Sequence, residues 1–244
     1  MADILENLAQ VRHRVAEAAE RADRDPDEVT IVAISKTFPS DAVVEAYEAG
    51  VRHFGENRVR EAIPKMPDVH AFISGPKPTW HMVGHIQSRK AKLVMENFDY
   101  VHSVDRVKIA RRLSQYGEAA GKTMPVLLEC NVSGEASKYG FDLSGWEEDK
   151  AKLEGFFETV EQMTAFPAIS IRGLMTMAPF VEEAETVRPV FASLRSLQDR
   201  LRERFPSQIW RQLSMGMTND FEVAVEEGAT MVRVGRAIFG PRTR

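Results

Sequence analysis

The sequence predicts an α/β protein folded as a single (β/α)8 barrel with an extra helix at its amino end. Three observations predict this fold. Eight short apolar segments alternate with helical patterns, no linker in the chain is longer than a loop, and the composition does not change along the 244 residues. A doubly wound open sheet typically has fewer strands, so eight of them favour a closed barrel. We therefore expect one domain over residues 1–244.

The extra helix and the first barrel unit come at the start of the chain. Apolar residues recur on one face from Ile4 to Ala22 with charged residues between them, which predicts a helix that ends near residues 23–27. The segment 29–35 (VTIVAIS) is apolar and β-branched, so it predicts the first strand. A helical pattern follows over 40–50 and ends at Gly50, a common stop signal.

The same unit recurs seven more times along the chain. Further strands are predicted over 51–57, 80–85, 100–104, 126–133, 169–177, 211–216 and 231–235. One helix between these strands is predicted to end near Pro64. The other helices are predicted over 86–98, 105–120, 146–164, 182–205 and 220–227. A proline-rich stretch (75–79) and a glycine-containing stretch through Gly140 are predicted as loops.

Composition and charge exclude several classes of protein. With 43% hydrophobic and 28% charged residues, the chain can bury a sizeable core and is not disordered. A net charge of −4 gives no general attraction for nucleic acid, although a local basic patch stays possible. No apolar stretch reaches the roughly 18 residues of a membrane span. The single cysteine, Cys130, and the acidic Asp3 and Glu6 near the start predict a cytoplasmic protein.

Polar residues and glycines gather where the predicted strands end. In a barrel these ends and the loops after them converge on one mouth, where ligands bind. The strand-end residues are Lys36, Glu56, Asn57, His81, His85, Ser103, Asn131, Met175, Thr176, Ser214, Met215, Gly216, Gly235 and Arg236. The pattern therefore predicts a ligand pocket at this mouth.

Lys36 directly follows the first predicted strand. Partial desolvation there would lower the pKa of its ammonium group and provide a free amine that can attack a carbonyl group. The alternative is a lysine that extends from the strand end into solvent, which is the commoner arrangement. Lys36 is therefore a candidate Schiff-base residue.

Two glycine-containing segments follow the seventh and eighth strands. Residues 214–220 (SMGMTND) and 234–240 (VGRAIFG) can turn backbone N–H groups toward an anion, and barrels often bind a phosphate between these loops. Alternatively, the glycines serve only tight turns. A lysine that faces a phosphate site suggests a phosphorylated aldehyde, which pyridoxal 5′-phosphate (PLP) and the substrate of a sugar-phosphate aldolase both satisfy.

The chain resembles the pyridoxal phosphate homeostasis proteins, which are similar to the N-terminal barrel of alanine racemase. The matching segments are 33–39 (AISKTFP), 53–61 (HFGENRVRE), 80–90 (WHMVGHIQSRK), 102–105 (HSVD), 131–141 (NVSGEASKYGF), 172–179 (RGLMTMAP) and 213–240. The resemblance covers nearly the whole chain in order. It implies a PLP-dependent barrel of fold type III and a monomer.

The resemblance also implies a set of cofactor-binding residues. Lys36 would hold PLP as a Schiff base, and Asn57 would lie beside its ring. Arg233 would face the pyridine nitrogen and make the ring a weaker electron sink. The remaining cofactor-binding residues that we expect are His81, Met175 and, in the phosphate loops, Ser214, Gly216, Gly235 and Arg236.

The chain departs from the family at two positions. Arg60 stands where the family usually has glutamine, and Arg236 stands where the family often has threonine or serine. If Arg236 points inward, it adds a charge-assisted bond to the phosphate; if it points outward, only its backbone N–H contributes.

Other candidate sites have weaker support. His81 and His85 have a spacing that can bind zinc on a helix, but they lie at a predicted strand end, and no third ligand is evident, so we expect no metal. Cys130 is expected to be a small buried hydrophobic residue. The segment 133–140 lacks the ending of a phosphate loop, and its Lys138 is expected to bring a positive charge to the pocket rim.

The function that follows is storage, buffering or delivery of PLP, without committed turnover. The expected partners are PLP and apo forms of PLP-dependent enzymes. The alternative is an amino-acid racemase, which needs a second acid/base group that alanine racemase takes from a C-terminal domain for which this chain has no room. A class I aldolase is disfavoured because its lysine usually lies on a later strand than Lys36 does.

Overall fold

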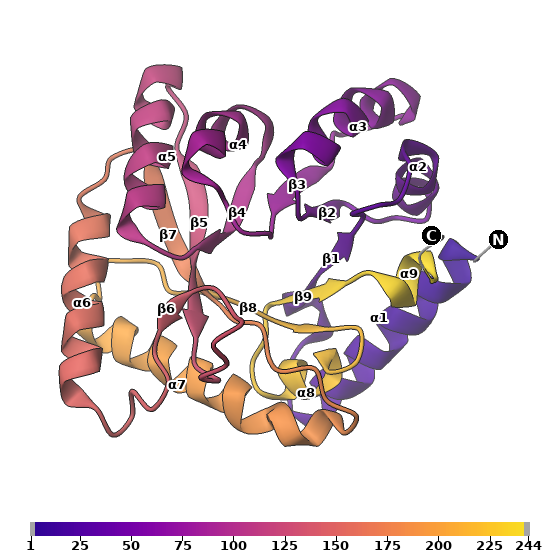
Figure 1. Cartoon of the computed structure of the whole chain (residues 1–244). Helices are drawn as coiled ribbons and strands as arrows, with labels where there is room; N and C mark the ends of the chain where they lie inside the picture. Colours follow the sequence, from indigo (N-terminus) through magenta and orange to yellow (C-terminus); the bar gives the residue numbers. More distant parts are fainter. Residues whose placement is uncertain (1–2, 242–244) are drawn as a thin grey trace.

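A computed structural model describes residues 3–241 of the chain. In this range, eight parallel strands close into a barrel with helices around it (Figure 1). The barrel strands are β1 (Thr30–Ile34), β2 (His53–Glu56), β3 (Thr79–Met82), β4 (Tyr100–Val104), β5 (Met124–Asn131), β7 (Ile169–Met175), β8 (Gln212–Met217) and β9 (Met231–Val234). The sheet order is β4-β3-β2-β1-β9-β8-β7-β5, and pairing of β4 with β5 closes it. The predicted barrel is therefore confirmed.

The helices surround the barrel in chain order. The α-helices are α1 (Ile4–Arg21), α2 (Ser40–Glu48), α3 (Val59–Phe72), α4 (Ala91–Asn97), α5 (Val107–Ala120), α6 (Lys150–Thr164), α7 (Arg188–Arg204), α8 (Phe221–Glu226) and α9 (Arg236–Phe239). Short 3-10 helices are η1 (Pro26–Glu28), η2 (Ser88–Lys90) and η3 (Ala184–Val187). No helix within residues 3–241 is long and apolar enough to cross a membrane.

The extra amino-terminal helix α1 lies along α8 and α9, outside the barrel (Figure 1). Asp3 begins it, because its carboxylate accepts a hydrogen bond of 3.0 Å from the backbone N–H of Glu6. The apolar face predicted from the sequence is buried, with Leu8 and Val11 each 1% exposed. The predicted extra helix is confirmed, and it ends at Arg21.

The barrel has an apolar layer outside and a smaller one inside. The outer layer packs the strands against the helices. The inner layer consists of Val32, Ile34, Val83, Leu127, Met175 and Met231. Because side chains alternate along a strand, Val32 and Ile34 of β1 both lie on the inside of the barrel.

Several elements differ from their predicted bounds. The helix predicted to end near Pro64 continues past Pro64 and Pro67 to Phe72. A proline inside a helix costs about 3 kcal/mol, but the buried face of α3 continues across it through Ala62, Met66 and Val69. Packing of that face therefore outweighs the loss of backbone hydrogen bonds.

Other differences are smaller. The helix predicted from residue 146 begins at Lys150, because Asp149 accepts a hydrogen bond from the backbone N–H of Lys152. The short strand β6 (Phe141–Asp142), which pairs with β5, and helix α9 were not predicted. Both are too short to produce a periodic pattern in the sequence.

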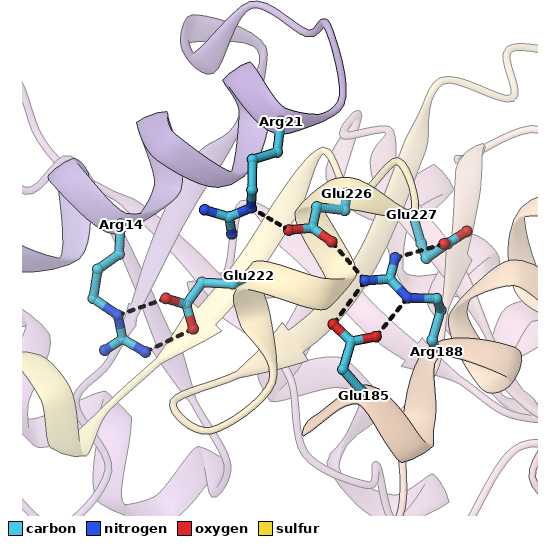
Figure 2. A network of polar contacts seen from close by, with 7 residues as sticks. All are labelled: Arg14, Arg21, Glu185, Arg188, Glu222, Glu226 and Glu227. Atoms are coloured by element: carbon cyan, nitrogen blue, oxygen red, sulfur yellow. Dashed lines mark hydrogen bonds and ion pairs between the residues drawn. The ribbon is translucent and has the colours of Figure 1, made fainter. Parts of the chain in front are cut away.

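An ion-pair network joins α1, α8 and the start of α7 (Figure 2). Arg188 binds three carboxylates, those of Glu185, Glu226 and Glu227, at 2.6–2.9 Å. Glu226 also binds Arg21 of α1. A further bidentate pair between Arg14 and Glu222 joins α1 to α8. The network fixes α8 next to η3, and the segments that precede these two elements both contribute to the mouth of the barrel.

Candidate functional site

A cavity of about 220 Å³ opens at the carboxyl ends of the strands. Five of the nine predicted site residues line it: Lys36, Asn57, Arg233, Gly235 and Arg236. The other lining residues are Ile34, Val83, Met177, Pro179, Phe180, Val181, Met217, Thr218, Asn219 and Asp220. The cavity therefore lies at the mouth where the sequence predicted a ligand pocket.

Lys36 lies two residues beyond the end of β1 and is half-buried. Thr37, which follows it, has a φ of 69° in the left-handed region. This conformation is unfavourable for a β-branched residue, and such strain is found where a fold fixes a functional group. The backbone next to Lys36 is therefore held in an unfavourable conformation by the surrounding structure.

A buried ion pair supports the strand ends that carry Lys36 and Asn57. Lys65 of α3 donates hydrogen bonds to the carboxylate of Glu56 (2.7 Å) and to the backbone carbonyl of Ser35 (2.8 Å). The hydroxyl of Ser35 donates to the same carboxylate at 2.8 Å. Ser35 and Glu56 directly precede the two cavity residues, so the pair ties both strand ends to α3.

Sequence reasoning missed the role of Lys65, although a signal was present. The position lies beside Met66 and three residues after Ala62, both on the apolar face of the helical pattern. A lysine at such a position either reaches solvent or pairs with a buried carboxylate. Lys65 is only 9% exposed, so the structure selects the second arrangement.

Arg233 forms part of the cavity wall and is only 5% exposed. Its guanidinium group donates to the Ser214 hydroxyl (2.7 Å) and to the backbone carbonyl of Thr176 (2.8 Å). Burial lowers the pKa of Arg233 to about 10, while the carboxylates of Asp220 and Glu129 act in the opposite direction. The side chain is therefore a fixed cation at neutral pH.

The loops after β8 and β9 form the other side of the cavity. Asp220 is buried and accepts a hydrogen bond of 2.5 Å from the backbone N–H of Met217, which closes the first loop. Burial raises the pKa of Asp220 above its ordinary value, although the charges of Arg233 and Lys138 act in the opposite direction. Arg236 is exposed, so its side chain lies at the rim.

Four predicted site residues do not line the cavity. Met175 is fully buried in the inner apolar layer with Ile34 and Val83, which do line it. Gly216 has a φ of 89°, and a Cβ atom there would lie 2.6 Å from Ala224 of α8, so this glycine allows β8 and α8 to approach closely. Ser214 and His81 are buried inside the barrel.

Ser214 and His81 belong to one hydrogen-bonded chain. His102 Nδ1 lies 2.8 Å from Ser214 Oγ, and His102 Nε2 lies 2.9 Å from His81 Nδ1. His81 Nε2 lies 3.0 Å from His53 Nδ1. The chain extends to the cavity through the bond between Ser214 and Arg233. His53 and His102 were not predicted as site residues, because nothing local in the sequence indicates that they meet.

The two histidines considered as zinc ligands have different surroundings. His85 pairs with Asp105 at 2.9 Å and stacks on Tyr139, away from His81. Within residues 3–241, no cluster of three or more histidine, cysteine or acidic side chains is arranged to hold a metal ion. Cys130 is buried, as expected for a small hydrophobic residue. Lys138 does not line the cavity and pairs with Glu135 at 3.5 Å.

Comparisons with known proteins agree with this architecture. Residues 7–243 match the family model described as alanine racemase, N-terminal domain. The chain is 43% identical over 242 residues to the pyridoxal phosphate homeostasis protein of Pseudomonas aeruginosa, covering 99% of this chain and 97% of that protein. It is 39% identical over 247 residues to the protein of that name from Escherichia coli strain K12, covering 99% and 98%.

Solved structures show the same fold. PipY of Synechococcus elongatus, solved without PLP and with PLP bound, matches with a TM-score of 0.81 and 36% identity, covering 97% of this chain and 100% of PipY. Alanine racemase of Clostridium difficile matches with a TM-score of 0.66 and 13% identity, over 97% of this chain and 56% of the racemase, which shows the fold alone. The chain therefore belongs to the alanine racemase N-terminal domain family and, within it, to the pyridoxal phosphate homeostasis proteins.

Proposed function

We propose that this protein binds PLP in the cavity and stores, buffers or delivers it without committed turnover. The observation that carries the proposal is the presence of Lys36 and Arg233 in the lining of one cavity. Relatives at 36–43% identity are named pyridoxal phosphate homeostasis proteins, and PipY has been solved with PLP bound. These similarities support the same ligand for this chain.

The chemistry of the cavity lining fits PLP. Ile34, Val83 and Met177 provide apolar surfaces for a flat ring. The amine of Lys36 can form a Schiff base with an aldehyde, and Arg233 offers N–H donors to a ring nitrogen. Gly235, Arg236, Thr218 and Asn219 line the same cavity, and we expect them to bind the phosphate.

Arg233 determines which kind of chemistry the site favours. When bound, PLP supplies an aldehyde for amine attachment and a ring that can accept electron density. A guanidinium group keeps its protons and is cationic at neutral pH, so Arg233 disfavours protonation of a nitrogen beside it. An unprotonated ring is a weak electron sink, which suits holding the cofactor better than stabilising a carbanion.

Racemisation would need an acid/base group on each face of the bound amino acid. Among the described residues that line the cavity, the titratable side chains are Lys36, Asp220, Arg233 and Arg236, with no histidine or tyrosine. Asp220 is already hydrogen-bonded to a backbone N–H. Lys36 could serve one face, but the lining provides no comparable group for the other.

Covalent attachment tests the binding proposal. The protein mixed with PLP should show the absorbance of a Schiff base, and borohydride reduction followed by peptide mass spectrometry should locate the cofactor on Lys36. Lys36→Ala should abolish this absorbance. Lys92→Ala, which removes an exposed lysine paired with Glu96 on α4, should leave it unchanged. Attachment to another lysine would overturn the assignment.

Two assays separate a carrier from an enzyme. Incubation of the PLP-loaded protein with the apo form of a PLP-dependent enzyme should restore activity to that enzyme, which tests delivery. Incubation with a panel of L-amino acids in deuterium oxide should give no sustained exchange at Cα. Robust exchange with loss of optical activity would instead establish the racemase alternative.

A further inference from the structure

A line of polar side chains runs through the interior of the barrel, next to the inner apolar layer. It links His53 of β2, His81 of β3, His102 of β4, Ser214 of β8 and Arg233 of β9. Each of its four contacts measures 2.7–3.0 Å between donor and acceptor atoms. His53 lines a hollow between α1 and the amino ends of β1 and β2, whereas Arg233 lines the cavity at the carboxyl ends. The line therefore connects the two ends of the barrel.

The direction of these hydrogen bonds follows from the arginine end. A guanidinium group only donates, so the Ser214 oxygen must accept from Arg233. The Ser214 hydroxyl proton is then available for its other partner, His102 Nδ1. His102 must therefore carry its own proton on Nε2, which points at His81 Nδ1.

The same reasoning extends to the outer histidine. Because His81 accepts on Nδ1, its neutral ring carries its proton on Nε2 and donates to His53 Nδ1. The opposite register would aim an N–H of His102 and an N–H of Arg233 at the same serine oxygen. The serine proton would then lose its acceptor, at the cost of an unsatisfied buried donor.

The surroundings keep the imidazole rings neutral. Burial lowers the pKa of His81 to about 3 and that of His102 well below its ordinary value. The charge of Arg233 lowers the pKa of His102 further. Tyr100 stacks on His81 with ring centroids 5.3 Å apart and covers one face of the His81 ring. A neutral ring has one donor and one acceptor, so each histidine transmits the direction set by its neighbour.

We infer that His53, His81 and His102 form a directional hydrogen-bond chain. This chain takes up the hydroxyl proton of Ser214, so that the Ser214 oxygen accepts from Arg233 and positions Arg233 in the cavity wall. In this hydrogen-bond chain His81, His102 and Ser214 are positioning residues, which act through Arg233. The hydrogen-bond chain is a property of the protein without ligand, whereas the effect of the positioned Arg233 on the pyridine ring of PLP rests on the proposed function. With Nη1 and Nη2 each anchored once, the remaining N–H groups of Arg233 can serve the cavity.

Nitrogen NMR of the ligand-free protein tests the direction. With 15N-labelled histidine, His81 and His102 should each be neutral and protonated on Nε2 across the neutral pH range. Protonation on Nδ1, a mixture of tautomers or an imidazolium ion at either residue would overturn the inference. Because no PLP is present, this result does not depend on whether the proposed function is correct.

Substitutions test the positioning role. Ser214→Ala removes the contact between His102 and Arg233 with little change in volume, and it should give a mixture of tautomers at His102. His13→Gln, which changes an exposed histidine paired with Glu17 on α1, should leave the His81 and His102 signals unchanged. If Ser214→Ala keeps the Nε2 tautomer at His102, the serine does not set the direction.

A matched pair at His102 distinguishes positioning from packing. His102→Asn keeps an acceptor for the Ser214 hydroxyl, and His102→Leu does not. The guanidinium signals of Arg233, assigned with Arg233→Lys, should remain hindered in rotation in the first variant and become mobile in the second. PLP should bind about tenfold more weakly to His102→Leu than to His102→Asn, as expected for one weakened charge-assisted hydrogen bond. Equal guanidinium signals in both variants would overturn the positioning role, whatever the PLP affinities are.

Discussion

Arg233 and Glu129 show how burial changes single residues near the cavity. Arg233 keeps its charge because its intrinsic pKa is high and two of its N–H groups have hydrogen-bond acceptors. Glu129 of β5 is 3% exposed, and its Oε2 atom has no hydrogen-bond partner among the described residues. Burial and the carboxylate of Asp105 raise the pKa of Glu129 to about 7, although the charge of Arg233 opposes this shift. A buried carboxyl group therefore titrates close to neutral pH.

We predict that Glu129→Gln stabilises the protein at high pH. The folded-state pKa of about 7 lies above the ordinary value of 4.5, so the native state binds more protons than the unfolded state between these values. The free energy of unfolding should therefore fall as pH rises through this window and level off above it. The glutamine variant lacks this dependence, and its advantage should be on the order of 2 kcal/mol at about pH 8 and near zero at about pH 4.

Urea denaturation at several pH values measures this difference. Glu158→Gln, which changes an exposed carboxylate on α6, is the control and should follow the wild-type pH dependence. Parallel pH profiles for wild type and Glu129→Gln would contradict the prediction.

At the level of elements, α3 is joined to the barrel by a charge as well as by its apolar face. Lys65 of α3 pairs with Glu56 of β2, and both are buried. The sequence predicts a helix that stops near Pro64, before this lysine. The pairing requires the helix to continue, because Lys65 lies beyond that proline. The length of α3 is therefore coupled to the geometry of the strand ends beneath the cavity.

We predict that Lys65→Met destabilises the protein by about 3–5 kcal/mol, because the carboxylate of Glu56 stays buried without its cation. The double variant Lys65→Met with Glu56→Gln should recover much of this loss, since no buried charge then remains. Chemical denaturation of the single and double variants measures both effects. Lys92→Met on α4 should change stability by less than about 0.5 kcal/mol. A double variant no more stable than Lys65→Met would show that the lost charge partner is not the cause.

At the level of the whole molecule, the large exposed apolar side chains come from different parts of the sequence. Among residues 3–241 they are Leu5, Phe72, Tyr139, Phe180 and Ile209, which lie on separate segments of the chain. Phe180, at 76% exposed, lines the cavity mouth. Single exposed apolar side chains are ordinary on a monomer, and the resemblance described above implies a monomer, so a monomer remains our prediction.

Sedimentation velocity over a range of protein concentrations checks the oligomeric state, with and without added PLP. A single species with the mass of one chain is expected. A concentration-dependent dimer would contradict the prediction, and Phe180→Ser would then show whether this exposed residue at the cavity mouth contributes to the contact.

The sequence alone determined the barrel, the extra helix and the position of Lys36 after the first strand. These features depend on local patterns: β-branched runs form strands, amphipathic spacing forms helices, and a residue that follows a parallel strand lies at the carboxyl end of the sheet. For the same reason Asn57, Gly235 and Arg236 were placed correctly at the mouth, where the structure shows them in the cavity lining.

Only the tertiary structure decided which residues meet inside the barrel. His53, His81, His102, Ser214 and Arg233 come from five strands, and their contacts depend on how far neighbouring strands are staggered when the sheet closes. Closure likewise places Ser214 and His81 inside the barrel and away from the cavity lining. Local patterns assign a residue to a strand, but the contact between distant strands is fixed by packing of the whole molecule, and a single sequence does not display it.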